Sequence, residues 1–328
     1  MAIDQPTTRG HRVYLTRSVP EAGIALLASA GLTIRMNPLP RALTPDELCR
    51  EVGRYDAVMC QATDRIDESV LEASRPRCRI FANCAVGYDN IDLAAAGRLG
   101  IVVTNTPDVL TEATADLTWA LMLAAARRVG EAERLVRAGV WRGWNMLDFL
   151  GADVYGKTLG IVGAGRIGTA VARRARGFDM KLLYFARSDK PAMAALGAER
   201  RTLAEVMEES DFVSVHLSLT RDTRRLIDDR AIRRMKKDAI FINTSRGAIV
   251  DQGALATALA QGRIAAAGLD VYLNEPMIPA ELMALENVVL LPHIGSATVS
   301  TRNRMAQTAA ANVVSVLRGE GPLNPVGI

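Results

Sequence analysis

The most constraining feature of this sequence is a glycine-rich turn that directly follows an apolar run. Residues 158–162 form a short β-rich segment, which leads through Gly163, Gly165 and Gly168 into a helical stretch. In this spacing the first glycine makes a tight turn, the second lets backbone approach a pyrophosphate, and the third lets the helix pack closely on the strand. Free N–H groups at the helix start then favour phosphate. The run predicts a dinucleotide-binding βαβ unit; the alternative is a glycine-rich turn without a ligand.

Short β-rich runs alternate with helical segments along the whole chain, which predicts parallel sheets covered by helices on both faces. A chain of 328 residues is long enough for two such domains. The expected strands are 12–16, 57–60, 79–83, 101–103, 158–162, 181–185, 212–217, 239–243, 266–270 and 288–291. The expected helices are 20–30, 67–73, 111–128, 166–177 and 300–317, and the segment 140–153 reads as irregular.

The composition is that of an ordinary globular protein, with 49% hydrophobic and 23% charged residues and a net charge of only +4. This mild basic surplus does not select nucleic acid as a partner. No basic leader with an apolar run is visible, and the most apolar segment, 117–126, is too short to span a bilayer. We therefore expect a cytoplasmic protein without nucleic-acid or membrane partners. The cysteines form no CxxC pair and have no histidine near them, so no metal site is expected: Cys49, Cys60, Cys78 and Cys84.

The segment after residues 181–185 bears on which nicotinamide cofactor the chain would prefer. An acidic residue at the end of this strand would hold the ribose 2′-hydroxyl of NAD. Ala186 stands there instead, and Arg187 and Ser188 follow it. Because a guanidinium binds a 2′-phosphate through charge-assisted hydrogen bonds, the sequence favours NADPH. Asp189 would still be able to serve a ribose, so NADH remains the alternative.

Polar residues stand at or beyond the ends of three predicted strands, the edge where open parallel sheets bind ligands. Arg246, Asp270 and His293 hold such positions, and Glu275 follows Asp270 in the same segment. Each has a purely structural alternative: a surface ion pair for Arg246, a cap for Asp270 and a helix-entry residue for Glu275. Their joint placement in one chain favours a catalytic cluster. The other two histidines are read as solvated in a polar arm and as packed within a strand, respectively: His11 and His216.

Five ordered runs, 83–92, 160–168, 243–247, 267–276 and 287–298, resemble the D-isomer-specific 2-hydroxyacid dehydrogenase family over essentially the whole chain. Within it the chain is most similar to the glyoxylate/hydroxypyruvate reductases, on residues 153–158, 292–298 and 301–303. The resemblance implies two doubly wound parallel-sheet domains, Rossmann-like and flavodoxin-like, with an active-site cleft between them. Residues 1–106 with 295–328 would form the substrate domain and 107–294 the dinucleotide-binding domain. It also implies a homodimer.

The resemblance further implies how such a chain would reduce a small 2-oxo acid. Protonated His293 would give its proton to the carbonyl oxygen as hydride arrives from the nicotinamide. Glu275 would hydrogen-bond the other ring nitrogen and fix its tautomer. Arg246 would clamp the substrate carboxylate and carbonyl. The backbone N–H groups of Val86 and Gly87 would hold the carboxylate from the other domain.

The remaining expected site residues concern the cofactor and four further positions. Ser296 and Arg302 would contact a substrate hydroxymethyl group, although surface roles are equally open. Trp141 and Trp144 would either approach a neighbouring subunit's active site or serve as interface or core aromatics. The expected cofactor contacts are Gly163, Ala164, Gly165, Arg166, Ile167 and Gly168 at the pyrophosphate, Ala186, Arg187 and Ser188 at the ribose, and Thr244, Ser245, Arg246, Asp270, His293, Ile294 and Gly295 around the nicotinamide, with Asp270 reading its carboxamide.

Two alternative functions remain open at this level. One is a reductase of another 2-oxo acid, of the 2-ketogluconate, D-lactate or phosphoglycerate type. The other is a nucleotide-sensing corepressor on the same fold, because fold alone does not decide function. A pure sensor would tolerate loss of the proton donor, whereas Arg246, Glu275 and His293 are all present.

Overall fold

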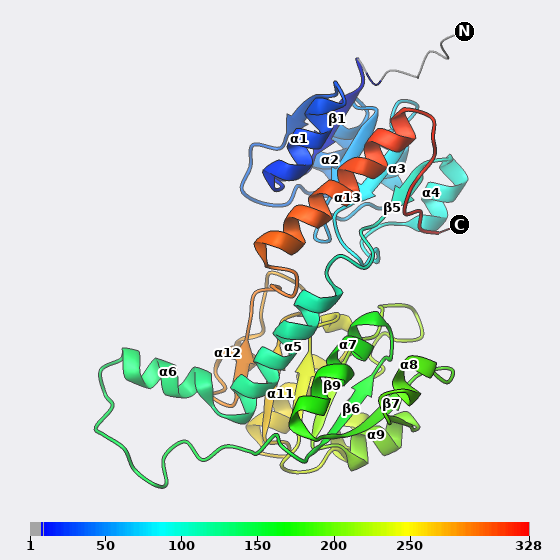
Figure 1. Cartoon of the computed structure of the whole chain (residues 1–328). Helices are drawn as coiled ribbons and strands as arrows, with labels where there is room; N and C mark the ends of the chain where they lie inside the picture. The colour runs from blue at the N-terminus through cyan, green and yellow to red at the C-terminus, as the bar shows by residue number, and fades with distance from the viewer. Residues whose placement is uncertain (1–7, 9, 328) are drawn as a thin grey trace. The chain divides into compact units, whose positions relative to one another are not determined.

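The computed structural model describes Thr8 and residues 10–327 of the chain. The chain forms two compact units (Figure 1). The first unit comprises Met1–Leu110 with Ser296–Ile328, and the second comprises Thr111–Gly295. The boundaries predicted from the sequence lay at residues 106/107 and 294/295.

The first unit is a five-stranded parallel sheet in the order β2-β1-β3-β4-β5. Two helices, α1 and α13, pack together on one face, and the shorter helices α2, α3 and α4 cover the other. The strands are β1 (Arg12–Leu15), β2 (Thr33–Met36), β3 (Ala57–Cys60), β4 (Ile80–Asn83) and β5 (Val102–Thr104). The helices are α1 (Glu21–Ser29), α2 (Pro45–Val52), α3 (Glu68–Ala73), α4 (Leu93–Leu99) and α13 (Val299–Leu317).

The second unit is a seven-stranded parallel sheet in the order β12-β11-β10-β9-β6-β7-β8. Helices α5 and α7 pack on one face, and α9, α10 and α11 on the other. The strands are β6 (Thr158–Val162), β7 (Lys181–Phe185), β8 (Glu199–Arg200), β9 (Phe212–Val215), β10 (Ile240–Asn243), β11 (Ala266–Leu269) and β12 (Val288–Leu290). The helices are α5 (Thr111–Ala126), α6 (Val129–Arg137), α7 (Arg166–Ala175), α8 (Pro191–Ala194), α9 (Leu203–Glu209), α10 (Asp229–Arg234), α11 (Gln252–Ala260) and α12 (Ala280–Met283).

Both sheets are doubly wound, so the predicted fold class is confirmed. In the second unit the strand order reverses between β6 and β9, and ligands of open α/β sheets bind at such a reversal. The central strands β9 and β10 are buried at every position. They read as nearly continuous apolar runs because a parallel sheet is covered on both faces. Two strands absent from the sequence prediction, β2 and β8, lie at sheet edges, and neither has a fully buried residue.

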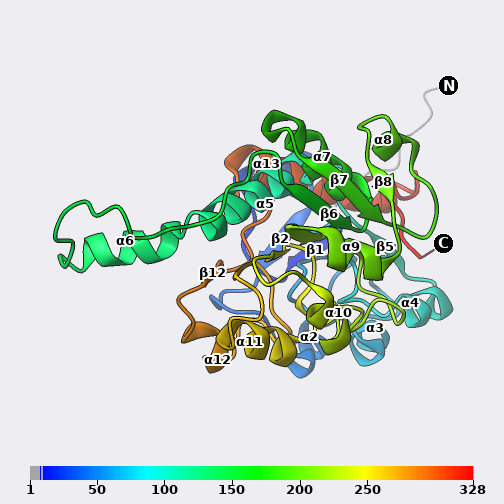
Figure 2. The same ribbon diagram turned by 90° about the horizontal axis from the view of Figure 1, so that it is seen from below.

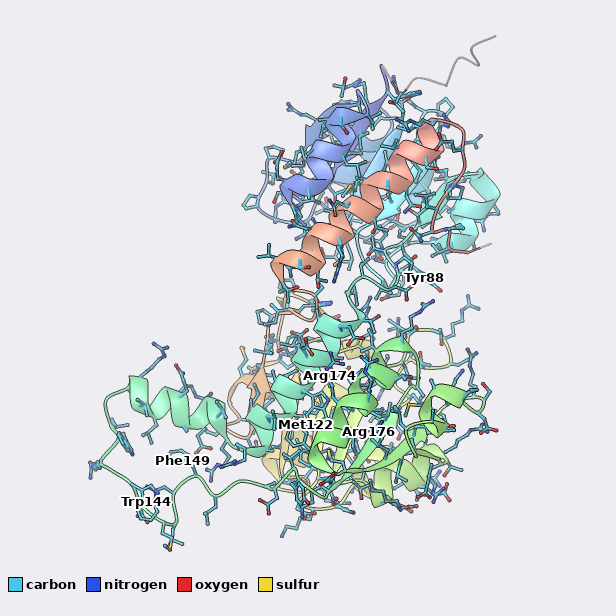
Figure 3. All side chains as sticks on the ribbon, viewed as in Figure 1. Tyr88, Met122, Trp144, Phe149, Arg174 and Arg176 are labelled. Carbon is cyan, nitrogen blue, oxygen red and sulfur yellow. The ribbon has the colours of Figure 1, made fainter. Side chains whose placement is uncertain are left out.

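A protruding arm extends from the second unit and consists of α6 with the irregular segment 138–151 (Figures 1 and 2). No residue of α6 is buried. Trp144 and Phe149 lie on the segment that follows this helix (Figure 3). The arm carries a run of exposed apolar side chains: Val129, Val136, Val140, Trp141, Trp144, Met146, Leu147 and Leu150.

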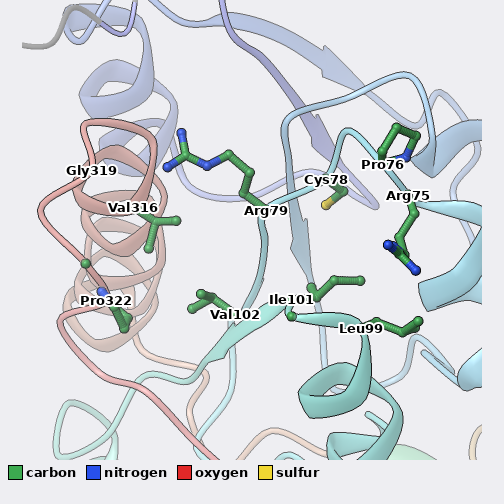
Figure 4. A pocket seen from close by; sticks show the side chains of 12 residues that line it. Arg75, Pro76, Cys78, Arg79, Leu99, Ile101, Val102, Val316, Gly319 and Pro322 are labelled. Carbon is green, nitrogen blue, oxygen red and sulfur yellow. The ribbon is translucent and has the colours of Figure 1, made fainter.

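Two further features of the described chain bear on function. A cavity of about 440 Å³ in the first unit lies beside the amino-terminal starts of β4 and β5 (Figure 4). It is therefore at the sheet edge opposite to the one at which parallel strands bind ligands. Among the described residues, no helix is both long and apolar enough to cross a membrane.

Candidate active site

The glycine turn after β6 is fixed by close backbone approach at two of its three glycines. Gly163 has φ +105°, and a Cβ there would lie 2.8 Å from the carbonyl carbon of His216 at the end of β9. A Cβ at Gly168 would lie 2.2 Å from the carbonyl oxygen of Gly163. Around Gly165, by contrast, a Cβ would meet no protein atom within 4 Å. The open space beside this backbone, at the start of the ten-residue helix α7, suits a pyrophosphate.

The loop after β7 presents a basic and a hydroxyl side chain to solvent. Ala186 is buried, whereas Arg187 and Ser188 are exposed. The carboxylate of Asp189 pairs with the guanidinium of Arg200 at 3.1 Å. The position expected for a ribose-binding acid therefore carries no carboxylate, and the nearest one is already paired.

A histidine–carboxylate pair lies beyond the ends of β11 and β12. The Nδ1 atom of His293 is 2.7 Å from Oε2 of Glu275, and the Tyr272 N–H donates to Oε1 of Glu275 at 3.0 Å. Burial alone would raise the pKa of Glu275, but the hydrogen bond and charge of His293, the Tyr272 N–H and the charge of Arg246 together lower it. Glu275 is therefore a carboxylate at neutral pH. Since Nδ1 faces Glu275, Nε2 is the ring nitrogen left for a substrate.

Asp270 holds the backbone on which His293 stands. His293 has φ +55°, a left-handed conformation that non-glycine residues adopt rarely and at a cost of about 1–3 kcal/mol. The two carboxylate oxygens of Asp270 accept the N–H groups of Ile294 at 2.7 Å and Gly295 at 2.8 Å. Burial raises the pKa of Asp270, against the opposing effect of these N–H groups and of the His293 charge. The structure thus shows that Asp270 positions the backbone beside His293. A hydrogen bond from Asp270 to the carboxamide of the nicotinamide stays a prediction.

Arg246 lies on a tightly folded loop after β10. The Asn243 side chain accepts the Ser245 N–H at 3.0 Å and donates to the carbonyl oxygen of Arg246 at 3.1 Å. A Cβ at Gly247 would lie 2.0 Å from the carbonyl carbon of Tyr272, so this loop packs directly on the segment that leads to Glu275. The charge of Arg246 also contributes to lowering the pKa of Glu275.

A chain of threonine hydroxyls from α5 joins two of these loops, and the sequence analysis missed it. Thr118 donates to the Thr114 carbonyl at 2.8 Å, and its hydroxyl is 2.9 Å from that of Thr244. Thr114 donates to the Gly295 carbonyl at 3.2 Å. The signal in the sequence was a pair of polar residues at i and i+4 on the buried face of an apolar helix.

The residues predicted to hold the substrate carboxylate lie in the first unit, after β4. The Asn105 amide donates to the Val86 carbonyl, and the Asn83 amide donates to the Gly87 carbonyl, each at 2.8 Å. Within the described residues, the N–H groups of Val86 and Gly87 have no hydrogen-bond acceptor. The Gly87 N–H shares its peptide with the Val86 carbonyl, and the Val86 N–H shares its peptide with the Ala85 carbonyl, which accepts the Thr106 N–H at 2.9 Å. Both N–H groups are thus held in place and remain available to an anion.

The structure also places the serine, the two tryptophans and the two remaining histidines that the sequence analysis named. Ser296 lies in the first unit, where its carbonyl accepts the Thr298 N–H at 2.8 Å. Trp141 and Trp144 are largely exposed on the protruding arm. His216 is hydrogen-bonded to Ser214 at 2.8 Å, and burial lowers its pKa to about 3, so it is a neutral packed residue as expected. His11 is partly buried, and its Nδ1 lies 3.5 Å from Asp56, so the reading of a solvated side chain was wrong.

Comparisons with a family model, with related proteins and with solved structures all identify the same family. A family model described as the D-isomer specific 2-hydroxyacid dehydrogenase NAD binding domain matches residues 119–295. A glyoxylate reductase of Thermococcus kodakarensis is 51% identical over 316 residues, which cover 95% of this chain and 94% of the relative. The crystal structure of a glyoxylate reductase from Paecilomyes thermophila has a TM-score of 0.86 at 33% identity, covering 96% of this chain and 98% of that one.

A third similar protein is an NADPH-dependent glyoxylate/hydroxypyruvate reductase from Sinorhizobium meliloti, solved with NADP and malonate. It has a TM-score of 0.86 at 32% identity, and the match covers 96% of each chain. The matched family model spans more than half of the sequence, and it includes the glycine turn, Arg246, Glu275 and His293. The chain therefore belongs to the D-isomer specific 2-hydroxyacid dehydrogenase family and is an oxidoreductase that uses a nicotinamide cofactor.

Proposed function

We propose that this chain reduces glyoxylate or hydroxypyruvate to the corresponding 2-hydroxy acid with NADPH. The observation that carries the proposal is the 2.7 Å pair of His293 and Glu275, with Arg246 nearby, at the sheet edge that also bears the glycine turn. The glyoxylate reductase relatives at about half identity favour this substrate class over 2-ketogluconate or D-lactate. A corepressor would have no need for a proton donor oriented by a carboxylate.

The reduced nicotinamide, when bound, supplies the hydride. His293 holds the proton at Nε2 and donates it to the carbonyl oxygen of the substrate. Its Nδ1–H remains hydrogen-bonded to the Glu275 carboxylate, which stabilises the ring before and after the transfer. Arg246 binds the substrate carboxylate and carbonyl through paired N–H groups and aligns the carbonyl carbon for attack.

In the first unit, the N–H groups of Val86 and Gly87 bind the substrate carboxylate. The carbonyls that share their peptides, those of Ala85 and Val86, accept from the Thr106 N–H and the Asn105 amide, so these two donors are preorganised and lose little freedom on binding. Ser296 and Arg302 contact the hydroxymethyl group of hydroxypyruvate, which glyoxylate lacks. A serine hydroxyl that pairs with a substrate hydroxyl would favour the larger substrate.

The preference for NADPH rests on the loop after β7. Arg187 and Ser188 are exposed there, Ala186 takes the place of a ribose-binding acid, and Asp189 is paired with Arg200. A 2′-phosphate would therefore meet a guanidinium and a hydroxyl rather than an unpaired carboxylate. Replacing Arg187 with alanine is expected to weaken NADPH binding more than NADH binding, and equal effects on both would withdraw the preference.

A homodimer is the proposed assembly, with the protruding arm packed against a second copy. The arm exposes Trp144 to 80% and Leu147 to 75%, and α6 has no buried residue. Exposed apolar surface of this extent is typical of protein interfaces. Sedimentation equilibrium of the purified protein tests the assembly: a concentration-independent monomer would contradict it. The cytoplasmic location stays a prediction.

The central experiment follows oxidation of NADPH by the purified protein with glyoxylate, hydroxypyruvate and D-lactate-type 2-oxo acids in parallel. His293→Ala is expected to lose most of its turnover while it still binds NADPH, because the imidazole donates a proton and contributes little to cofactor affinity. A fully active variant would remove the mechanism. A wild-type protein that reduces none of these acids would remove the proposed function.

A further inference from the structure

The loop that would receive the 2′-phosphate is tied to the edge strand β8 by one side chain. Arg200 is the second residue of this two-residue strand, and it lies opposite Tyr184 of β7 in the parallel pairing. From there its guanidinium reaches forward to the loop that follows β7. No residue of β8 belonged to the predicted site.

Arg200 donates to three groups of that loop. Its Nε donates to the Ala186 carbonyl at 3.2 Å, its Nη2 to the Arg187 carbonyl at 2.9 Å, and its Nη1 to Oδ1 of Asp189 at 3.1 Å. A planar guanidinium with its donors in a fixed fork can hold three acceptors at once, which an ammonium cannot do with the same geometry. One side chain thus fixes both the path of the loop and the position of its only carboxylate.

These contacts determine where the loop directs its own N–H groups. In a planar trans peptide, the C=O and the following N–H point in opposite directions. Because the carbonyls of Ala186 and Arg187 face Arg200, the N–H groups of Arg187 and Ser188 face away from it. Among the described residues, neither N–H has an acceptor. Both N–H groups are therefore available to an anion that approaches this side of the loop.

The same contacts also remove an electrostatic obstacle. Asp189 carries the only negative charge between Ala186 and Lys190, and its side chain is 84% exposed. Left unpaired, this carboxylate would repel a phosphate bound at the neighbouring residues. The ion pair with Arg200 compensates the charge and holds the carboxylate on the side of β8.

We propose that Arg200 is a positioning residue that determines selectivity for the 2′-phosphorylated cofactor. It holds the loop so that the N–H groups and side chains of Arg187 and Ser188 face the phosphate, and it neutralises Asp189. This inference rests on the proposed use of NADPH but not on the identity of the 2-oxo acid. It makes the selectivity of this loop depend on an edge strand as well as on the loop's own residues.

The test is isothermal titration calorimetry of the purified full-length protein with NADPH and NADH, and with 2′,5′-ADP and AMP, which differ only by the 2′-phosphate. Arg200→Met is expected to weaken NADPH and 2′,5′-ADP binding about tenfold, the effect of losing one charge-assisted interaction, and NADH and AMP binding less than about twofold. The ion pair is exposed and contributes little to folding, so the variant should remain folded. Retained NADH binding confirms this directly.

Arg201→Met is the matched control, because it removes one positive charge at the next position. Arg201 pairs with Glu199 and Glu209, and among the described residues it forms no hydrogen bond or ion pair with residues 186–189. The ratio of NADPH to NADH affinity in this variant should stay within about twofold of wild type. The substitution removes a positive charge near the loop but leaves the hydrogen bonds that hold the loop. An equal loss of selectivity in both variants would reduce the effect to net charge and overturn the proposal.

The double variant Arg200→Met with Asp189→Asn separates positioning from direct contact. Removing the unpaired carboxylate should recover part of the lost NADPH affinity. A selective loss without any recovery would make Arg200 a direct phosphate ligand and overturn the positioning role. If Arg187→Ala loses selectivity and Arg200→Met does not, the inference fails while the proposed function stands. If wild-type protein binds NADPH no more tightly than NADH, the cofactor preference and this inference fail together.

Discussion

Replacing Glu275 with glutamine would test the histidine–carboxylate pair with little change in shape. The carboxylate has two contacts, the His293 ring at 2.7 Å and the Tyr272 N–H at 3.0 Å. A glutamine can keep one oxygen acceptor in place, but it carries no charge. The variant therefore removes the electrostatic part of the interaction and leaves most of the packing.

The expected magnitude follows from the kind of hydrogen bond that is lost. A bond to a charged group contributes about 1.5–3 kcal/mol, against about 0.5–1.5 kcal/mol for a neutral one, so the protonated ring loses about 1–2 kcal/mol of stabilisation. Reduction consumes the protonated ring, so kcat/KM for glyoxylate should fall. Because about 1.4 kcal/mol corresponds to a factor of ten in rate, the expected loss is about fivefold to thirtyfold.

The assay is steady-state oxidation of NADPH by glyoxylate at neutral pH. Glu281→Gln serves as the control, because Glu281 is an exposed acid on α12. That variant loses the same charge, but among the described residues Glu281 forms no hydrogen bond or ion pair with His293, so its kcat/KM should match wild type. An unchanged kcat/KM in Glu275→Gln would refute the reasoning.

Three further substitutions test the support of the site. Gly247→Ala places a Cβ 2.0 Å from the Tyr272 carbonyl carbon, and thermal denaturation should show a loss of about 1–3 kcal/mol, with a fall in kcat; unchanged stability would contradict the close packing. Thr118→Val leaves the buried Thr244 hydroxyl without its partner, and urea denaturation should show a loss of about 1–3 kcal/mol that Thr118→Ser does not share. Arg246→Lys cannot form paired hydrogen bonds, so kcat/KM for glyoxylate should fall about tenfold to a hundredfold, and a near wild-type value would exclude the clamp.

Local patterns in the sequence were sufficient for the buried strands of both sheets. Strands β3, β6 and β7 have the predicted bounds. A short apolar run between turn residues is removed from water when it forms a strand in a sheet that is covered on both faces. The edge strands β2 and β8 were missed, since β2 alternates exposed and half-buried side chains over only four residues and both residues of β8 are exposed. The short helices α2 and α9 were also not predicted, although each begins with a capping box: Thr44 with Glu47, and Thr202 with Glu205.

By itself, the sequence determined the chemistry that the chain carries: the glycine spacing after a strand, and an arginine, a glutamate and a histidine near strand ends. These are local properties, set by steric limits on each residue and by its position relative to a buried run. Only the tertiary structure decided which groups act on one another. Asp270 holds two N–H groups beside the left-handed His293, more than twenty residues away. The threonines of α5 contact the loop after β10, and Arg200 contacts the loop after β7. Such contacts depend on the order of the strands in the sheet, which local patterns do not contain.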